Sequence, residues 1–498
     1  MKILTVFSPR MVALYVAVFQ KLNEKYSDLE VIAIATKPRS QSAGLWIKPK
    51  PISALYSWAE LENEFMHKQV DPETRDRLID EYGDEINKIW IADRQLGRAF
   101  SAEAIYPFTP LMRHTVGNTD NALNFIFNSI VFHEKVFEIH QPDIVIGGAN
   151  LVTFFVSRKK NIEYRSICTP RIGNQILLDD NIYDMQTPVA TLFKNKKKDR
   201  GILAKSRKFI DDVRNKSLQP GYYSAKKPWL ETITNKEIIY LSIISAARRK
   251  SDDVRKADPW DELKHRFNHL WRHTRITKHL FEKYEPDRLG KFAYFPLHVT
   301  PEYTTILLAP EYTNQICVIE NLAKAIPPDM QLVVKEHIPM LGRRPRGFYE
   351  HLTSIPKVVL IDPEISSHEL IKQAEFVSVI TGTAGFEALI YGTPLLLFGD
   401  PGYTIIGSGF IKARGGKLLR EDIEKVLTLD KADEGAILRY VSCVYECSID
   451  IDFSELYTTH TTQSIRDNPE VVEKLVELYS ADLERHCSDK KRAKVRSL

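Results

Sequence analysis

The residues with the clearest chemical potential lie in the stretch 381–387, Thr-Gly-Thr-Ala-Gly-Phe-Glu. An apolar run at residues 376–380 precedes it, and an Ala/Leu-rich segment ending at Gly392 follows it. This pattern predicts a strand, a tight turn and a helix. Small residues let the backbone approach a ligand, and the free N–H groups of a new helix suit a phosphate.

Glu387 lies one turn into that predicted helix, where a carboxylate accepts hydrogen bonds from ribose hydroxyls. The stretch therefore predicts a nucleotide site, with the contacts Thr381, Gly382, Thr383 and Glu387. The alternative is that Gly382 and Gly385 only allow close packing of the helix on the strand.

A second group of ionisable residues follows the predicted strand 331–335, which ends in Lys335, Glu336 and His337. Ligands bind at the carboxyl ends of parallel strands. A histidine there donates to a phosphate oxygen, and a lysine supplies a compact positive charge. We therefore predict that all three residues contribute to the nucleotide site.

A third group follows the predicted strand 292–295 and brings His298 and Glu302 onto one loop. The pair predicts an acid and base, or a contact to an acceptor. Gln315, at the start of the next helix, is expected to point the same way. Nearer the N-terminus, Asn150 ends a glycine-containing loop between a strand and a helix, which predicts a ligand-contacting position.

Composition restricts the class of protein. The chain has 498 residues, 43% of them hydrophobic and 27% charged, which is typical of a soluble protein with two or three domains. A formal net charge of +4 does not favour a nucleic-acid partner. Five scattered cysteines and no signal-peptide pattern predict a cytoplasmic protein without disulfides. Cys443 and Cys447 lack the second pair that a zinc site requires.

Two clusters of positive charge stand out: an internal basic run at residues 194–208 and a C-terminal basic run at residues 490–496. Such runs are either solvated surfaces or attract anionic glycans and membrane surfaces. They predict peripheral contact with the inner face of a membrane.

The order of predicted elements indicates an α/β fold with two doubly wound, Rossmann-like domains. We expect a first domain at residues 1–188 with a helical insertion, and a basic helical linker at 189–291. A second domain at 292–425 carries the three residue groups described above, and a helical extension with a basic tail occupies 426–498.

The motifs of the second predicted domain resemble the bacterial capsule polysaccharide biosynthesis family, some of whose members are Kdo transferases. The similarity is carried in order by 295–305, 335–337, 343–345, 348–349, 361–363, 369–371 and 381–388. A fainter match covers 169–174 and Asp180 with Asn181. The Lys-Glu-His stretch also looks like the His-Pro motif of bacterial sialyltransferases, from which it departs because Ile338 separates His337 from Pro339.

The resemblance implies a GT-B glycosyltransferase, with the nucleotide sugar held by the second domain. Such an enzyme normally takes its catalytic carboxylate from the first domain. The resemblance therefore makes Asp179 or Asp180 the candidate, with Glu302 as the competitor, and places Arg171 and Asn174 on the acceptor side.

We therefore expect sugar transfer from a nucleotide donor, CMP-linked and of Kdo or sialic type, onto a surface polysaccharide or glycolipid. A metal or other cofactor is not expected. The alternatives are a polyol-phosphate transferase, a nucleotide-sugar epimerase of similar architecture, or a non-catalytic glycan-binding export protein. The Asp450–Asp452 pair is interpreted as a chance match to a metal-binding Asp-x-Asp, because it lies in a polar stretch.

Overall fold

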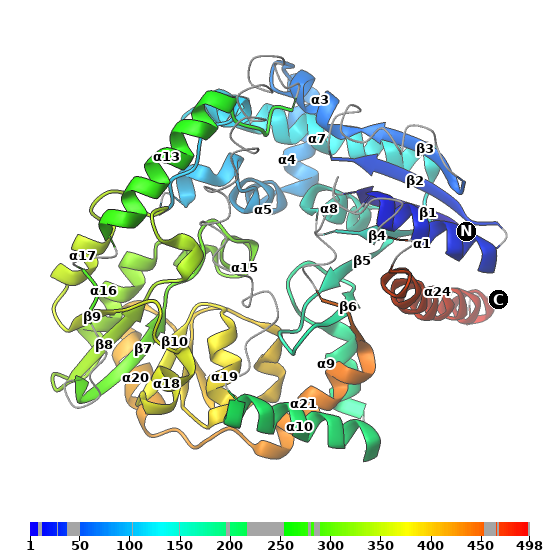
Figure 1. Cartoon of the computed structure of the whole chain (residues 1–498). Helices are drawn as coiled ribbons and strands as arrows, with labels where there is room; N and C mark the ends of the chain where they lie inside the picture. The colour runs from blue at the N-terminus through cyan, green and yellow to red at the C-terminus, as the bar shows by residue number, and fades with distance from the viewer. Residues whose placement is uncertain are drawn as a thin grey trace.

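The computed structural model describes the chain except for residues 8–11, 27, 37–49, 102, 149, 196–199, 217–252, 277–279, 283–288, 453–464, 466–467 and 497–498. Within the described residues, the strands form one seven-stranded and one six-stranded sheet. Figure 1 shows the two sheets as separate units, each covered by helices.

The first sheet is built around five parallel strands, and two more strands are added at one edge by antiparallel pairing. In spatial order it contains β13 (Ile449–Asp450), β6 (Gln175–Asp179), β5 (Glu163–Cys168), β4 (Ile144–Gly147), β1 (Lys2–Phe7), β2 (Glu30–Ala35) and β3 (Ile52–Ser57). The antiparallel pairs are β6 to β5 and β13 to β6. The central strand β1 is paired with β2 from Lys2 opposite Glu30 to Phe7 opposite Ala35.

The second sheet is parallel throughout. Its order is β12 (Phe410–Lys412), β11 (Leu395–Leu397), β10 (Phe376–Val379), β7 (Lys291–Pro296), β8 (Met330–Lys335) and β9 (Val358–Ile361). The chain leaves β7 toward β8 on one side and later returns to β10 on the other. The switch in direction therefore lies at β7 and β10, where open α/β sheets bind ligands.

The strand residues are apolar on both sides, because helices cover both faces of each sheet. On the first sheet, Ile3 and Phe7 pack with the helices α1 and α24, while Leu4 and Val6 face the other helical layer. The helices of this half are α1 (Val12–Lys25), α3 (Trp58–Phe65), α4 (Pro72–Tyr82), α5 (Asp84–Ala92), α6 (Pro110–Thr115), α7 (Thr119–His140) and α8 (Leu151–Lys159).

Further helices lie between the sheets or belong to the second one. They are α9 (Thr187–Asn195), α10 (Arg200–Lys216), α13 (Pro259–Ile276), α15 (Tyr303–Ile306), α16 (Gln315–Ala325), α17 (Phe348–Ser354), α18 (Ser367–Gln373), α19 (Thr383–Tyr391), α20 (Leu419–Leu427), α21 (Glu434–Cys447) and α24 (Glu470–Arg496). In Figure 1, α24 lies beside the first sheet at the far end of the chain, in agreement with its packing against α1.

One apolar cluster joins the two halves. Ile172, Leu177 and Val189 of the first half are buried in the same cluster as Phe386 and Tyr403 of the second. Apolar burial of this kind is the main favourable term in association, so it fixes the two sheets relative to each other at this point.

The predicted strands and helices of both sheets agree with the structure to within a few residues at most ends. The sequence pattern predicts one helix at about 385–391 and a last helix from 469 to about 486. In the structure α19 begins at Thr383, and α24 continues to Arg496. Strands β3, β6, β12 and β13 were not predicted. Asp450, which the sequence analysis placed in a polar stretch, ends the two-residue edge strand β13 (Ile449–Asp450).

Candidate functional site

The three predicted residue groups of the second half follow neighbouring strands. His298 comes after β7, Lys335 ends β8, and Thr381 comes after β10. Because β7 lies between β8 and β10 and all three are parallel, the three loops meet at the carboxyl edge of the second sheet. The structure therefore brings these groups together at the switch point of the sheet.

The turn at 381–383 is held by side chains from several elements. The Thr381 hydroxyl donates to the Thr304 carbonyl oxygen (3.0 Å), and its backbone N–H donates to His298 Nε2 (3.4 Å). Tyr403 Oη donates to the Gly382 carbonyl oxygen (3.1 Å). Arg171 of the first half donates to the Thr381 carbonyl oxygen. The turn thus has a fixed main-chain shape before any ligand binds.

The two glycines of this turn differ in how little room surrounds them. A Cβ on Gly385 would lie 2.2 Å from Tyr403 Oη and 2.9 Å from Val379 Cγ2. A Cβ on Gly382 would lie 3.1 Å from His298 Nε2. Close packing therefore explains the glycine at 385. Gly382 is the N-cap of α19, and there a side chain would lie close to the His298 ring.

Lys335 and Glu387 form an electrostatically coupled pair of partly exposed side chains. Burial raises the pKa of Glu387 to about 7, against the opposing effect of Lys335. Burial lowers the pKa of Lys335 to about 8, against the attraction of Glu387 and Asp362. Lys335 Nζ also donates to Ser367 Oγ (2.9 Å). Perturbed groups of this kind at a strand end are typical of functional sites.

Glu336 is fully buried, and its carboxylate is hydrogen-bonded to neighbouring residues of the protein. Its carboxylate accepts from Arg344 Nε (2.7 Å), Arg344 Nη2 (3.0 Å), Tyr349 Oη (2.8 Å) and the backbone N–H of His337 (2.7 Å). Neither Glu336 nor Arg344 has an exposed side chain. The geometry makes Glu336 an anchor of the loop that carries His337. His337 itself is partly exposed, and burial lowers its pKa despite the nearby Glu336 carboxylate.

His298 and Gln315 also hold the loops in place. Burial, together with the charges of Arg171 and His337, lowers the pKa of His298 to about 3, so the ring is neutral and accepts from the Thr381 backbone N–H. Gln315 is buried, accepts from the His298 backbone N–H (2.7 Å), and donates to the His298 carbonyl oxygen (3.1 Å) and Thr300 Oγ1 (2.8 Å).

Glu302 differs from His298 because it remains partly exposed, just before α15. Burial raises its pKa, opposed by a hydrogen bond with Thr304 and by the charges of Arg171 and Arg94. A carboxylate with a raised pKa is a stronger proton acceptor than an ordinary one, which suits the role of a general base.

The predicted acceptor-side residues Arg171, Asn150 and Asn174 do not form one cluster in the structure. Arg171 reaches the turn of the second half and also forms an ion pair with Asp184 (Nη2 to Oδ2, 3.3 Å). Asn150 caps α8 by accepting from the Thr153 backbone N–H (2.9 Å). The Asn174 carbonyl oxygen accepts from the backbone N–H of Ile451, next to β13.

Asp179 and Asp180 lie at the end of β6, a strand that the sequence did not predict. Asp179 is the last residue of the antiparallel strand β6, paired with Ser166, and is fully buried. Its carboxylate accepts from the backbone N–H groups of Gln186 (2.8 Å) and Thr187 (3.0 Å). Burial raises its pKa to about 6, and these two hydrogen bonds oppose the rise. Asp180 is exposed.

Sequence reasoning missed Asp184, Arg344 and Tyr403. Asp184 accepts from the Gly402 backbone N–H (Oδ2, 3.4 Å) as well as pairing with Arg171, so it joins the two halves. Arg344 lies in the stretch 343–345 that carried the family resemblance, which is the signal that singles it out.

Part of the chain is similar to a known protein family. Residues 263–410 match the model of a family described as capsule polysaccharide biosynthesis protein. The matched segment contains Lys335, His337 and the turn at 381–383. This confirms the family resemblance over the segment that forms most of the second sheet. No curated protein matches the sequence.

Solved structures with a similar arrangement include KpsC of Thermosulfurimonas dismutans, a beta Kdo 2,7 transferase. It has 15% identity and a TM-score of 0.38, and the match covers 70% of this chain and 89% of that one. The beta Kdo 2,4 transferase of the same KpsC matches at 12% identity, 62% and 85% coverage, and a TM-score of 0.34. UDP-GlcNAc 2-epimerase from Neisseria meningitidis matches at 12% identity, 96% and 100% coverage, and a TM-score of 0.22. Because these values are low, the fold is assigned from the strand order of this chain.

Within the described residues, no helix combines the length and apolar character needed to span a membrane. The same residues contain no group of three or more His, Cys, Asp or Glu side chains arranged to hold a metal. Lys196, Lys197 and Lys198 of the internal basic run lie outside the described residues, as do the side chains of the C-terminal basic run.

Proposed function

We propose that the protein is a glycosyltransferase that moves a sugar from a nucleotide donor onto a capsule or surface polysaccharide or glycolipid. The observation that carries the proposal is the position of Lys335, at the end of β8, and of Glu387, in α19, at the switch point of the second sheet. The family match over 263–410 supports it. The donor proposed is a CMP-linked sugar of Kdo or sialic type.

The roles follow from exposure and charge. Lys335 and the N–H groups at the start of α19 would stabilise the phosphate of the leaving nucleotide, and His337 would donate to a phosphate oxygen. Glu387 would accept hydrogen bonds from ribose hydroxyls. Thr383, the first residue of α19, is partly exposed and would meet the phosphate. The buried Glu336 positions the His337 loop rather than contacting the nucleotide.

Acceptor activation requires a base, and Glu302 is the better candidate. It is partly exposed, its pKa is raised, and it lies within the influence of Arg171 from the other half. Asp179 is buried and bonded to main-chain N–H groups, so we assign it to fixing the loop before α9. Asp180 stays a candidate because it is exposed. His298 and Gln315 position the turn and the loop that precedes Glu302.

The domain boundaries are proposed as 1–188, 189–291, 292–425 and 426–498. Within the last segment, β13 and α24 add to the first sheet, and α21 packs where the two halves meet. The acceptor is proposed to approach from the side of Arg171, since that residue reaches the turn at 381–383 from the first half.

A binding panel tests the donor. Purified protein is titrated calorimetrically with CMP, UDP, GDP and ADP, and CMP is expected to bind most tightly. His337→Ala should weaken CMP binding by about 1.5–3 kcal/mol, the usual contribution of a hydrogen bond to a charged group. His351→Ala is the matched control, because that exposed histidine pairs with Glu320 on the outside of the same half.

Unchanged CMP affinity in a folded His337→Ala protein would reject the phosphate assignment. Incubation with nucleotide sugars then separates the reaction classes: transfer or donor hydrolysis supports the proposal, a 2-epimer product indicates an epimerase, and binding of glycan alone indicates a non-catalytic protein. We also propose that transfer survives EDTA, because Lys335 and α19 supply positive charge at the phosphate.

A further inference from the structure

A cavity of about 620 Å³ lies beside the candidate site, and six of its lining residues are arginine or lysine. Its walls come from the helical insertion of the first half, from α13, and from the loops after β7 and β8. The cationic residues that line it are Arg94, Arg98, Arg255, Lys256, Arg266 and Arg343. His265 and His269 add two imidazoles, and Glu262 is the one carboxylate among the described lining residues.

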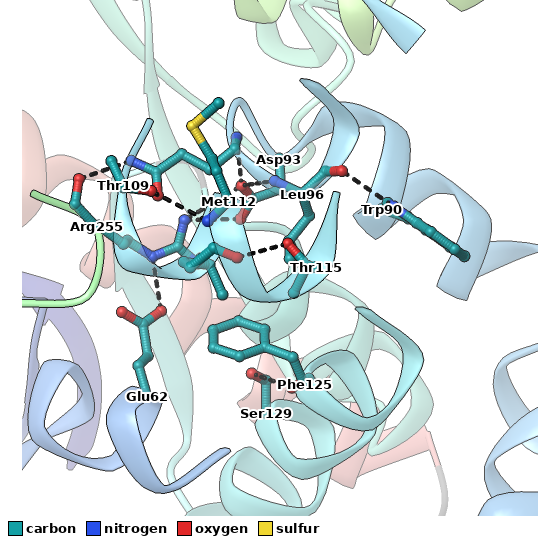
Figure 2. A network of polar contacts seen from close by, with 12 residues as sticks. Glu62, Trp90, Asp93, Leu96, Thr109, Met112, Thr115, Phe125, Ser129 and Arg255 are labelled. Carbon is teal, nitrogen blue, oxygen red and sulfur yellow. Dashed lines mark hydrogen bonds and ion pairs between the residues drawn. The ribbon is translucent and has the colours of Figure 1, made fainter. Parts of the chain in front are cut away.

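Two of these arginines are neutralised by the protein itself. Arg255 donates to Glu62 Oε1 (2.8 Å) and Asp93 Oδ2 (2.9 Å), and Figure 2 shows its guanidinium held between the two carboxylates. Arg266 pairs with Glu262 (2.9 Å). These two side chains build the walls of the cavity.

The other four cations, Arg94, Arg98, Lys256 and Arg343, have no ion pair within the described part of the chain. Arg98 is the most constrained of them, because its Nη1 atom is buried without a hydrogen-bond partner. Burial also lowers the pKa of Arg98, although the group remains charged at neutral pH. A buried guanidinium N–H without an acceptor is costly, and an anion in the cavity would supply that acceptor.

The Arg98 and Arg343 guanidinium groups both lie close to the ring of Tyr106. The Arg98 and Arg343 guanidinium carbons lie 5.1 Å and 5.8 Å from the centre of its ring, and His265 stacks on it with the ring centres 6.3 Å apart. Two guanidinium groups on one ring repel each other, and an anion between them offsets this repulsion. Consistent with a positive potential, Arg343 and Arg98 lower the pKa of His265 in addition to the effect of burial.

We propose that this cavity is an oxyanion-binding site that takes a phosphate or carboxylate group through Arg98 and Arg343. Pro301 and Ile338 line it, and they are the neighbours of Glu302 and His337. If the proposed sugar transfer is correct, on which this assignment of the ligand rests, the anionic group belongs to the acceptor. The cavity itself is distinct from the phosphate site at Lys335 and α19.

The test uses inorganic pyrophosphate as the probe, titrated calorimetrically into the full-length protein at constant ionic strength. Arg98→Gln and Arg343→Gln should each weaken binding about tenfold or more, since each removes a charge-assisted hydrogen bond. Arg98→Lys keeps the charge and should retain most of the affinity. Arg75→Gln, on the exposed helix α4 and paired with Asp76, is the matched control and should change nothing.

Two further measurements extend the test. Binding of glycans shows whether the cavity takes a carboxylate group, and binding of CMP shows whether the cavity and the nucleotide site are independent. An oligogalacturonate should bind and lose affinity in Arg98→Gln, whereas a neutral galactan of equal length should not bind. CMP affinity should be unchanged in Arg98→Gln. Failure of the wild type to bind CMP would reject the proposed function but leave the pyrophosphate result standing.

The cavity proposal is overturned if wild-type protein does not bind pyrophosphate. It is also overturned if folded Arg98→Gln and Arg343→Gln proteins bind it normally. A third contrary result is loss of pyrophosphate binding in Lys335→Gln with no loss in Arg98→Gln, because the anion then occupies the nucleotide site.

Discussion

Replacing Glu336 with Ala should destabilise the second sheet strongly. The carboxylate accepts four hydrogen bonds in a place without solvent, two of them from Arg344. After its removal, the polar partners left to Arg344 among the described residues are the His298 carbonyl oxygen (2.9 Å) and a distant Glu103 carboxylate (3.7 Å). Breaking a buried ion pair by removing one partner costs about 3–5 kcal/mol, so we expect a loss of this size.

The double substitution Glu336→Leu with Arg344→Met distinguishes the pair from simple packing. Replacing both charges with apolar groups removes the uncompensated charge, and such replacements are often close to neutral. The loss in the double variant should therefore be far smaller than the sum of the single losses. Asp329→Ala is the control, because its ion pair with Lys291 on the same sheet is exposed.

Hydrogen exchange followed by mass spectrometry measures these effects locally. Peptides that cover β8 and the His337 loop report the free energy of opening of this part of the molecule. If Glu336→Ala leaves the protection of β8 and the urea midpoint as in the wild type, the pair does not stabilise the loop. Glu336 would then be available to a ligand, as the sequence alone suggested.

Three further predictions concern activity and location. Because the pKa of Lys335 is lowered to about 8, its positive charge is lost as the pH rises through that value. CMP affinity measured from pH 6 to 10 should fall above pH 8 in the wild type and stay level in Lys335→Arg; parallel profiles would exclude Lys335 from the phosphate site. Glu302→Gln should lower turnover at least about a hundredfold with little change in CMP affinity, as expected for loss of a general base, whereas equal turnover would move the role to Asp180. Sedimentation with anionic liposomes should decline steeply with salt, since each cation of the basic runs contributes about 1 kcal/mol at most, and equal binding to neutral liposomes would show that the runs are only solvated surfaces.

The sequence was sufficient for the α/β class and for most strands of both sheets. Strands β7, β8 and β10 are short apolar runs bounded by turn residues, and this pattern is local. The position of Lys335, His298 and Thr381 at one edge also follows from the sequence, because successive parallel strands place their carboxyl ends together. The individual roles at the site stay predictions until they are tested.

Other features depended on contacts between distant residues. Strand β13 is two residues long and exists only because it pairs with β6, and β6 is antiparallel, which places Asp179 inside the protein. The sequence shows that Glu336 is ionisable but not that Arg344 and Tyr349 enclose it.

The sequence by itself determined the features that depend on local patterns, and the tertiary structure decided those that depend on contacts between distant residues. Local patterns specify which segments bury apolar surface and where charged groups end a strand. Whether a charged group meets a ligand or a partner within the protein depends on which distant side chain desolvates or neutralises it. In the sequence, Arg255 and Arg98 are two residues of the same type. In the structure, Arg255 is held by two carboxylates, whereas Arg98 has a buried N–H without an acceptor among the described residues. Only the folded chain distinguishes them, because the carboxylates that neutralise Arg255 come from residues 62 and 93, far away in the sequence.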